Sequence, residues 1–142
     1  MKRKPIKKRQ IVLIIIGICL LWIGGTLYMD HLKLEEEMVK VVNSEEAKIV
    51  LETGLKNIDP NALTSEGVIQ SYQIDYESIK RNPMGGIDID LIINENNRLI
   101  VFNNLDRYRI NGELENSGGG WSRELDKLLK ERMDDDELYW TG

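Results

Sequence analysis

The sequence predicts an α+β fold with an N-terminal transmembrane helix. The domain that follows is expected to hold an N-terminal helix, a small antiparallel sheet of three or four strands and a C-terminal amphipathic helix. The spacing of apolar residues leads to this prediction, because it changes twice along the chain. It is three or four in residues 32–58, two in residues 68–102, and three or four again after residue 121.

The N-terminus combines a basic tail with an apolar segment. Nineteen residues without a charge, Ile11–Met29, would reach about 28 Å as a helix, close to the ~30 Å hydrocarbon core of a bilayer. Because Lys and Arg are retained in the cytoplasm, the tail predicts a single-pass protein of the cell membrane with its C-terminal domain extracellular. The expected regions are a cytoplasmic basic tail (1–10), a transmembrane anchor (11–29) and an extracytoplasmic domain (30–142). The basic residues of the tail are Lys2, Arg3, Lys4, Lys7, Lys8 and Arg9.

A cleaved signal peptide is the alternative to a retained anchor, and it would give a secreted protein. A cut after Gly25 would place Ile23 at the −3 position, where signal peptides carry a small residue. The retained anchor is therefore the favoured interpretation.

The composition of the domain excludes several kinds of function. Thirteen Lys and Arg face twenty-four Asp and Glu after residue 29, a net charge of −11, so a nucleic-acid partner is not expected. The domain has no cysteine, which excludes a disulfide and a thiol nucleophile. With His31 as its one histidine, it lacks parts of a Ser-His-Asp triad and of most zinc sites. We expect no enzyme activity, no cofactor and no bound metal.

The helical spacing in residues 32–58 predicts one long helix or two helices joined by a kink. Asn43 and Glu46 have the form of a capping box, which would place the break near Asn43–Ser44. The Asp59–Pro60 step ends the helical pattern, and Pro60 is suited to open a short helix over residues 61–66.

The alternating segments predict the sheet. Residues 68–76 form one strand, and residues 87–94 pair with residues 98–102 through a turn at Asn96–Asn97. This turn would place Leu91 opposite Phe102 and would bring the two apolar faces together. Residues 107–114 are expected to form a weaker strand.

A glycine-rich segment follows the predicted strands. Ser117–Gly120 is interpreted as a flexible lead-in to the C-terminal helix rather than as a phosphate-binding loop, because it lacks the P-loop lysine. Apolar residues of that helix form a stripe on one face, and we expect this stripe to pack into the core. The stripe consists of Trp121, Leu125, Leu128, Leu129 and Met133.

A block of turn residues is the candidate binding site. The favoured interpretation is a fixed turn, because proline sets φ and paired glycines permit positive φ. The functional interpretation is a recognition loop that exposes Met84. The block consists of Asn82, Pro83, Met84, Gly85 and Gly86.

Asp88 and Asp90 project from one face of a predicted strand. Paired carboxylates can carry out acid–base chemistry, but alternating Asp on a solvated face also keeps a sheet soluble. We favour the second interpretation.

Several segments of the chain resemble a known bacterial family. The segments are Leu55–Thr64, Gly67–Asp75 and Asn82–Ile87, and the similarity extends over residues 42–129. The sequence resembles domain-of-unknown-function family 1310, which is found in small tethered or exported proteins of Gram-positive bacteria. The resemblance implies an extracytoplasmic location and one compact domain, and it assigns no catalytic residue.

These observations favour a membrane-anchored extracytoplasmic binding or accessory protein that acts through protein or peptide contacts, for example in protection against a secreted peptide. The acidic domain favours a cationic partner through electrostatic steering. One alternative is a hydrolase or carbohydrate-processing enzyme that uses Asp88 and Asp90. Another is a structural subunit of a membrane complex, with the anchor as its interface. The oligomeric state is not predicted.

Overall fold

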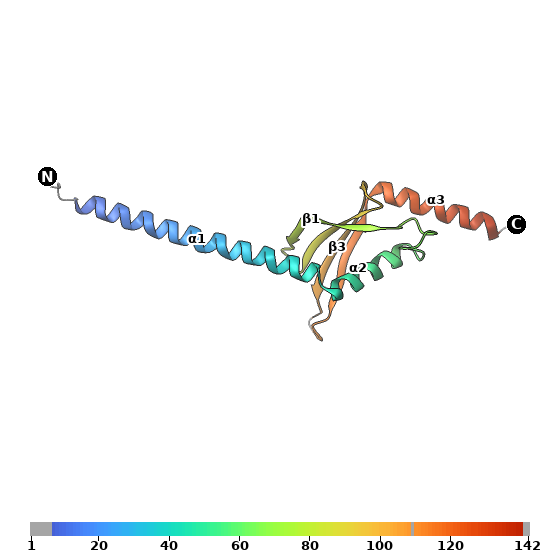
Figure 1. The fold of residues 1–142 in the computed structure, drawn as a ribbon, viewed down its shortest axis with the longest axis horizontal. Helices are drawn as coiled ribbons and strands as arrows, with labels where there is room; N and C mark the ends of the chain where they lie inside the picture. Colours follow the sequence, from blue (N-terminus) through green and yellow to red (C-terminus); the bar gives the residue numbers. More distant parts are fainter. Residues whose placement is uncertain (1–6, 109, 141–142) are drawn as a thin grey trace. The chain divides into compact units, whose positions relative to one another are not determined.

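A computed structural model of the chain describes residues 7–108 and 110–140, the last five of these by their backbone only. It confirms the α+β class, with three helices and a four-stranded sheet among the described residues (Figure 1). The chain divides into two compact units between Glu37 and Met38. The elements are α1 (Lys8–Val42), α2 (Glu45–Ile58), β1 (Tyr72–Arg81), β2 (Ile87–Ile93), β3 (Asn96–Arg107), β4 (Leu114–Trp121) and α3 (Arg123–Trp140).

Helix α1 contains the apolar N-terminal segment and continues without interruption into the first residues of the second unit. Its most apolar stretch of eighteen residues has none of its residues buried. By length and composition α1 can cross a membrane, and an apolar helix near an N-terminus can equally be a signal sequence.

The break between α1 and α2 lies where the sequence predicts it, although a different residue caps the second helix. Ser44 is the N-cap, in an extended conformation, and its Oγ accepts a hydrogen bond from the N–H of Ala47 at 3.1 Å. The same hydroxyl donates to the carbonyl of Val41 at 2.6 Å. The expected capping box of Asn43 and Glu46 is therefore wrong, because Ser44 takes the capping position.

A compact turn connects α2 to β1, and the short helix predicted over residues 61–66 does not form. The buried carboxylate of Asp59 accepts hydrogen bonds from the N–H groups of Asn61 and Ile69, at 3.1 Å and 2.9 Å. These bonds close the segment into a loop. Gly67 is required there, because a Cβ at this position would lie 2.3 Å from the carbonyl oxygen of Asn61.

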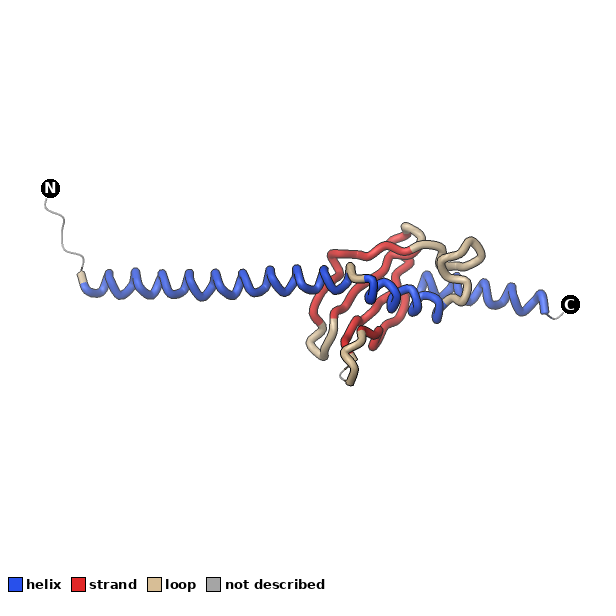
Figure 2. The backbone as a smooth tube through the Cα atoms, turned by 60° about the horizontal axis from the view of Figure 1, so that its bottom comes forward, coloured by secondary structure: helices blue, strands red, loops and turns tan. Residues whose placement is uncertain are grey.

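The four strands form an antiparallel meander in the order β1-β2-β3-β4. One face of the sheet packs against Leu51 and Leu55 of α2 and Leu125 of α3, so both helices cover the same face. Figure 2 shows α2 in front of the strands. The buried apolar residues of the sheet are Ile89, Leu91, Ile93, Leu99, Val101, Leu105 and Leu114.

The β2–β3 hairpin is present, but its register differs by one residue from the prediction. Leu91 pairs with Val101, and Phe102 lies on the opposite, solvent-facing side of the sheet. The turn residues are Asn94 and Glu95, both with positive φ, rather than Asn96 and Asn97. The Asn94 side chain explains the difference: it accepts from the N–H groups of Gln70 and Ser71 and donates to the carbonyl of Val68. These contacts hold the turn two positions earlier, at Asn94–Glu95.

Residues 107–114 and Ser117–Gly120 also differ from the prediction. Of the first segment, Arg107 ends β3 and Leu114 begins β4, and the N–H of Tyr108 donates to the carbonyl of Glu113 in the connection between them. The second segment belongs to β4, where Gly118, Gly119 and Gly120 pair with residues of β3. Pairing with β3 therefore supplies the strand conformation that the glycines do not favour by themselves.

The C-terminal helix buries fewer residues than its apolar stripe predicts. Leu125 is fully buried and Leu129 packs partly against the core, whereas Leu128 and Met133 are exposed. Trp121 is the last residue of β4 and is 42 % exposed, so its expected place in the core is wrong.

Candidate interaction surfaces

The predicted turn of residues 82–86 connects β1 to β2 and is held by its own hydrogen bonds. The Asn82 N–H donates to the carbonyl of Gly86, and the Asn82 side-chain oxygen accepts from the N–H of Met84 at 2.8 Å. Gly85 and Gly86 have φ of 123° and 80°, which favour glycine. The geometry is that of a fixed turn, and it leaves the Met84 side chain 98 % exposed.

Asp88 fastens this turn to β3. Its Oδ1 accepts hydrogen bonds from the side-chain amides of Asn82 and Asn104, both at 2.8 Å. Donation by Asn104 and then by Asn82 holds the pKa of the Asp88 carboxyl below its usual value. Asn104 also donates to the carbonyl of Gly85 and accepts from the hydroxyl of Ser117. The Asp88 carboxylate therefore has a structural role, which is to hold the β1–β2 turn against β3.

Asp90 lies beside Asp88 in an open hollow of about 460 Å³ on the solvent-facing side of the sheet. Burial, followed by the carboxylate of Asp75, raises the pKa of Asp90. Lys80 lines the same hollow and opposes this shift. Within residues 7–108 and 110–140, no group of three or more His, Cys, Asp or Glu side chains is placed to hold a metal ion.

A second hollow, of about 450 Å³, lies between α2 and β4, and we call it the α2–β4 groove. Ile49 of α2 and Trp121 of β4 line it and are 64 % and 42 % exposed. The glycines Gly119 and Gly120 line it with backbone alone. The groove thus joins an exposed apolar surface to the main chain of a strand.

An amide pair provides polar groups in this largely apolar groove. The buried Asn103 donates from Nδ2 to the carbonyl of Val101 at 3.1 Å and accepts from Nδ2 of Asn116 at 2.8 Å. Gly54 of α2 faces the pair, and a Cβ at this position would lie 3.4 Å from Nδ2 of Asn116. This separation is an ordinary van der Waals contact, so α2 passes close to the amide pair at Gly54.

The charge at the β4 edge is negative. Glu115 is the single ionisable residue that lines the groove. Glu115 pairs directly with Asp106 across β3 and β4, and two carboxylates facing each other in a sheet repel. At one end, Nε1 of Trp121 donates to Oδ1 of Asp126 at 3.2 Å.

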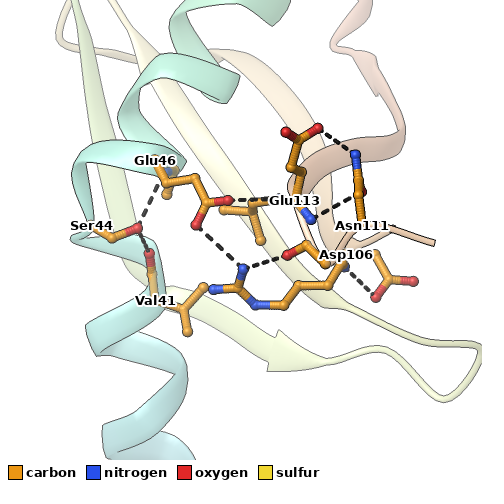
Figure 3. Close-up of polar contacts among 10 residues, drawn as sticks. Val41, Ser44, Glu46, Asp106, Asn111 and Glu113 are labelled. Atoms are coloured by element: carbon orange, nitrogen blue, oxygen red, sulfur yellow. Dashed lines mark hydrogen bonds and ion pairs between the residues drawn. The ribbon is translucent and has the colours of Figure 1, made fainter. Parts of the chain in front are cut away.

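Glu46 connects α2 to the start of β4 and so positions the two walls of the groove. Its Oε1 accepts from the N–H of Leu114 at 2.8 Å, and its Oε2 lies 3.3 Å from Nη1 of Arg107 (Figure 3). Arg107 also donates to the carbonyl of Gly112 at 2.8 Å, which secures the loop between β3 and β4. One carboxylate thus ties the helix to both ends of the loop.

Local sequence patterns do not predict the groove, because its walls are far apart in the chain. The groove requires Glu46 to lie beside Leu114, although the two residues are 68 positions apart in the sequence. The one available signal was the glycine content of α2 and β4, and Ser117–Gly120 was interpreted as a lead-in to a helix.

Comparisons with known proteins give one match. The family described as "Protein of unknown function (DUF1310)" matches residues 9–128. Neither a search of curated proteins nor a search of solved structures finds a match. Because the family matches both the apolar helix and most of the α+β domain, the chain belongs to the DUF1310 family.

Proposed function

We propose that this protein is a membrane-anchored binding protein whose α+β domain faces the outside of the cell and contacts a peptide or a protein. The observation that carries the proposal is the α2–β4 groove. It presents exposed apolar side chains, a strand backbone and a pair of amides in one open hollow. Surface hollows of this composition are typical of recognition sites.

The location is supported by the N-terminal sequence. Six cations precede an apolar segment with no buried residue in α1, and no acidic residue occurs before Asp30. Moving the cations across a bilayer would cost several kcal/mol each, which favours a cytoplasmic N-terminus. The poor cleavage site around Ile23 favours a retained anchor over secretion.

Binding is favoured over catalysis by the surroundings of Asp88. Its Oδ1 is engaged by two amides that hold the β1–β2 turn, so a change of protonation would disturb the fold. The hydrolase alternative requires Asp88 and Asp90 to act on a substrate together. A variant with both residues changed to Asn that remains folded by circular dichroism should retain its physiological effect if the domain binds, and should lose it if they are catalytic.

A photo-cross-linking amino acid at position 49 tests the proposal in cells that produce the protein. Ile49 lies in the groove, and Met84, which is exposed on the turn, provides the matched control. We expect illumination of intact cells to give a covalent adduct with a peptide or protein at position 49 and none at position 84. An adduct at position 84 alone would assign recognition to the turn of residues 82–86. The absence of an adduct at both positions would contradict a binding function.

A structural subunit of a membrane complex is distinguished by exchanging the anchor. Replacing Ile11–Met29 with an unrelated transmembrane segment should preserve the adduct at position 49. Loss of function with an unrelated anchor would instead assign the interface to α1.

A further inference from the structure

Strand β4 has one free edge. In the sheet order β1-β2-β3-β4 it pairs with β3 on one side, and no other described strand lies on its second side. Edge strands usually carry Lys, Pro or covering segments that prevent pairing with another chain. The sequence of β4, LENSGGGW, contains neither Lys nor Pro, and Ser117 to Gly119 are exposed. Its one irregularity is a shift of register beside Ser117, which leaves residues 118–121 as a regular edge.

The other edge of the sheet, β1, is different. Its pairing with β2 is interrupted between Asp75 and Lys80, where four residues of β1 have no partner in the register. The hydroxyl of Ser78 folds this segment back by donating to the carbonyl of Asp75 at 2.6 Å. An irregular edge is a poor template for a further strand. Of the two edge strands, β4 is therefore the better template for pairing with a further strand.

The α2–β4 groove lies beside the regular part of this edge. Gly119, Gly120 and Trp121 belong to both the groove and the edge. Side chains of a strand point alternately to the two faces of a sheet, so a strand added at β4 would direct every second side chain toward the groove. Ile49 and Trp121 would contact those side chains, which favours apolar residues at alternate positions.

The charges at the β4 edge indicate which charge a segment bound there should carry. Asp106 and Glu115 face each other across β3 and β4, and Glu115 is the sole ionisable lining residue of the groove. The region after residue 29 carries a net charge of −11. A cationic segment would relieve the repulsion between the two carboxylates, whereas a second, equally acidic copy of the chain would add to it.

We propose that the free edge of β4 receives an extended cationic peptide segment as an additional strand, with alternate apolar side chains in the α2–β4 groove. The inference rests on the proposed binding function and specifies its mode. Main-chain hydrogen bonds to β4 supply affinity, and the groove supplies selectivity for the alternating pattern.

The test uses the full-length chain in nanodiscs of phosphatidylcholine, a lipid without net charge. The probe is an eight-residue peptide of alternating Val and Lys. One matched peptide replaces Lys with Glu, and another carries N-methyl groups on its four central residues, which removes N–H donors while keeping the charge. Dissociation constants are measured by titration calorimetry, and hydrogen exchange is measured for the amides of residues 118–121.

We expect the Val–Lys peptide to bind about ten-fold or more tightly than either matched peptide. The N-methylated peptide loses main-chain hydrogen bonds, and the Val–Glu peptide has the same sign of charge as Glu115. Every 1.4 kcal/mol lost in this way corresponds to a factor of ten in the dissociation constant. Amides of residues 118–121 should gain protection on binding. Glu115→Gln should weaken binding by about three-fold, the scale of an exposed charge contact, while Glu77→Gln on β1 should leave it unchanged.

Equal affinity for the N-methylated peptide would overturn strand addition, and equal affinity for the Val–Glu peptide would overturn the cationic occupant. A second copy seated on β4 would also overturn the proposal, and sedimentation would detect it as a dimer that persists in the presence of the peptide. If position 49 still forms its adduct in cells when these peptide results are negative, the binding function stands and this mode of binding fails.

Discussion

Single residues show where the backbone of this fold leaves no room for a side chain. A Cβ at Gly119 would lie 2.3 Å from the carbonyl oxygen of Phe102, whereas a Cβ at Gly118 or Gly120 would meet nothing within 4 Å. The three glycines are adjacent in β4, but only the middle one is required by a close approach of two strands.

The first prediction follows from this contrast. Gly119→Ala should lower the free energy of unfolding by about 1–3 kcal/mol, the usual cost of overpacking. Gly120→Ala is the matched control and should change it by less than about 0.5 kcal/mol. Urea unfolding of the full-length variants in detergent measures both. Equal stabilities would show that β4 moves away from β3 at little cost.

Tyr72 provides a prediction on pH. Burial, and then the charge and hydrogen bond of Glu52, raise the pKa of Tyr72 from 10.0 to about 12. The pKa of Tyr72 is higher in the folded than in the unfolded protein. Its contribution to the free energy of unfolding is therefore fully present below pH 10 and is lost as the pH rises toward 12.

The comparison variant is Tyr72→Phe, which cannot ionise. The difference in unfolding free energy between wild type and variant should become less favourable to wild type between about pH 10 and about pH 12, in urea titrations. A difference that is constant over this interval would contradict the raised pKa.

At the scale of elements, the β2–β3 hairpin carries backbone strain in its turn. Asn94 and Glu95 have φ of 52° and 56°, the combination that a type I′ turn requires and that Asn-Gly satisfies best. Glu95 has no conformational preference for this region. The fold tolerates it because Asn94 fixes the turn through bonds to Gln70, Ser71 and Val68.

We therefore predict that Glu95→Gly stabilises the protein by about 0.5–1 kcal/mol through relief of positive φ. Glu95→Ala removes the same carboxylate without this relief and should not stabilise. The melting temperatures of the two variants distinguish these effects. A similar increase in both would assign the effect to the lost charge instead.

The elements show how far local patterns predict this fold. The helix break near Ser44 and the existence of the β2–β3 hairpin were predicted because capping residues and alternating apolar residues act over a few positions. The hairpin register was wrong by one residue, since the bonds of Asn94 to residues 23 to 26 positions away are invisible to a local pattern. Strand β4 was missed because Gly118–Gly120 becomes a strand only when β3 lies beside it.

For the candidate sites too, local features could be predicted from the sequence and long-range contacts could not. The turn of residues 82–86 was predicted in its place and in its fixed conformation, because proline and paired glycines impose it. The hydrogen bond from Asn104 to Asp88, which fastens this turn to β3, could not be predicted. The two residues are sixteen positions apart and become neighbours only when β3 pairs with β2. The α2–β4 groove depends on two elements that only the tertiary fold makes neighbours.

At the scale of the whole chain, three segments of different character follow one another. The first ten residues are basic, the following helix is apolar, and the region after residue 29 is acidic. The proposed function requires the basic and the acidic segment to lie on opposite sides of a membrane that the apolar helix crosses, with the α2–β4 groove outside. Every contact proposed for the groove depends on that orientation.

Protease treatment of intact, wall-stripped cells tests this orientation most directly. We predict that the domain is digested while an N-terminal fragment that includes Ile11–Met29 remains in the membrane, as detected through a tag at the N-terminus. Release of a product that begins near Leu27 into the medium would contradict the retained anchor. A domain that stays intact until the membrane is broken would contradict the outward orientation and, with it, the proposed function.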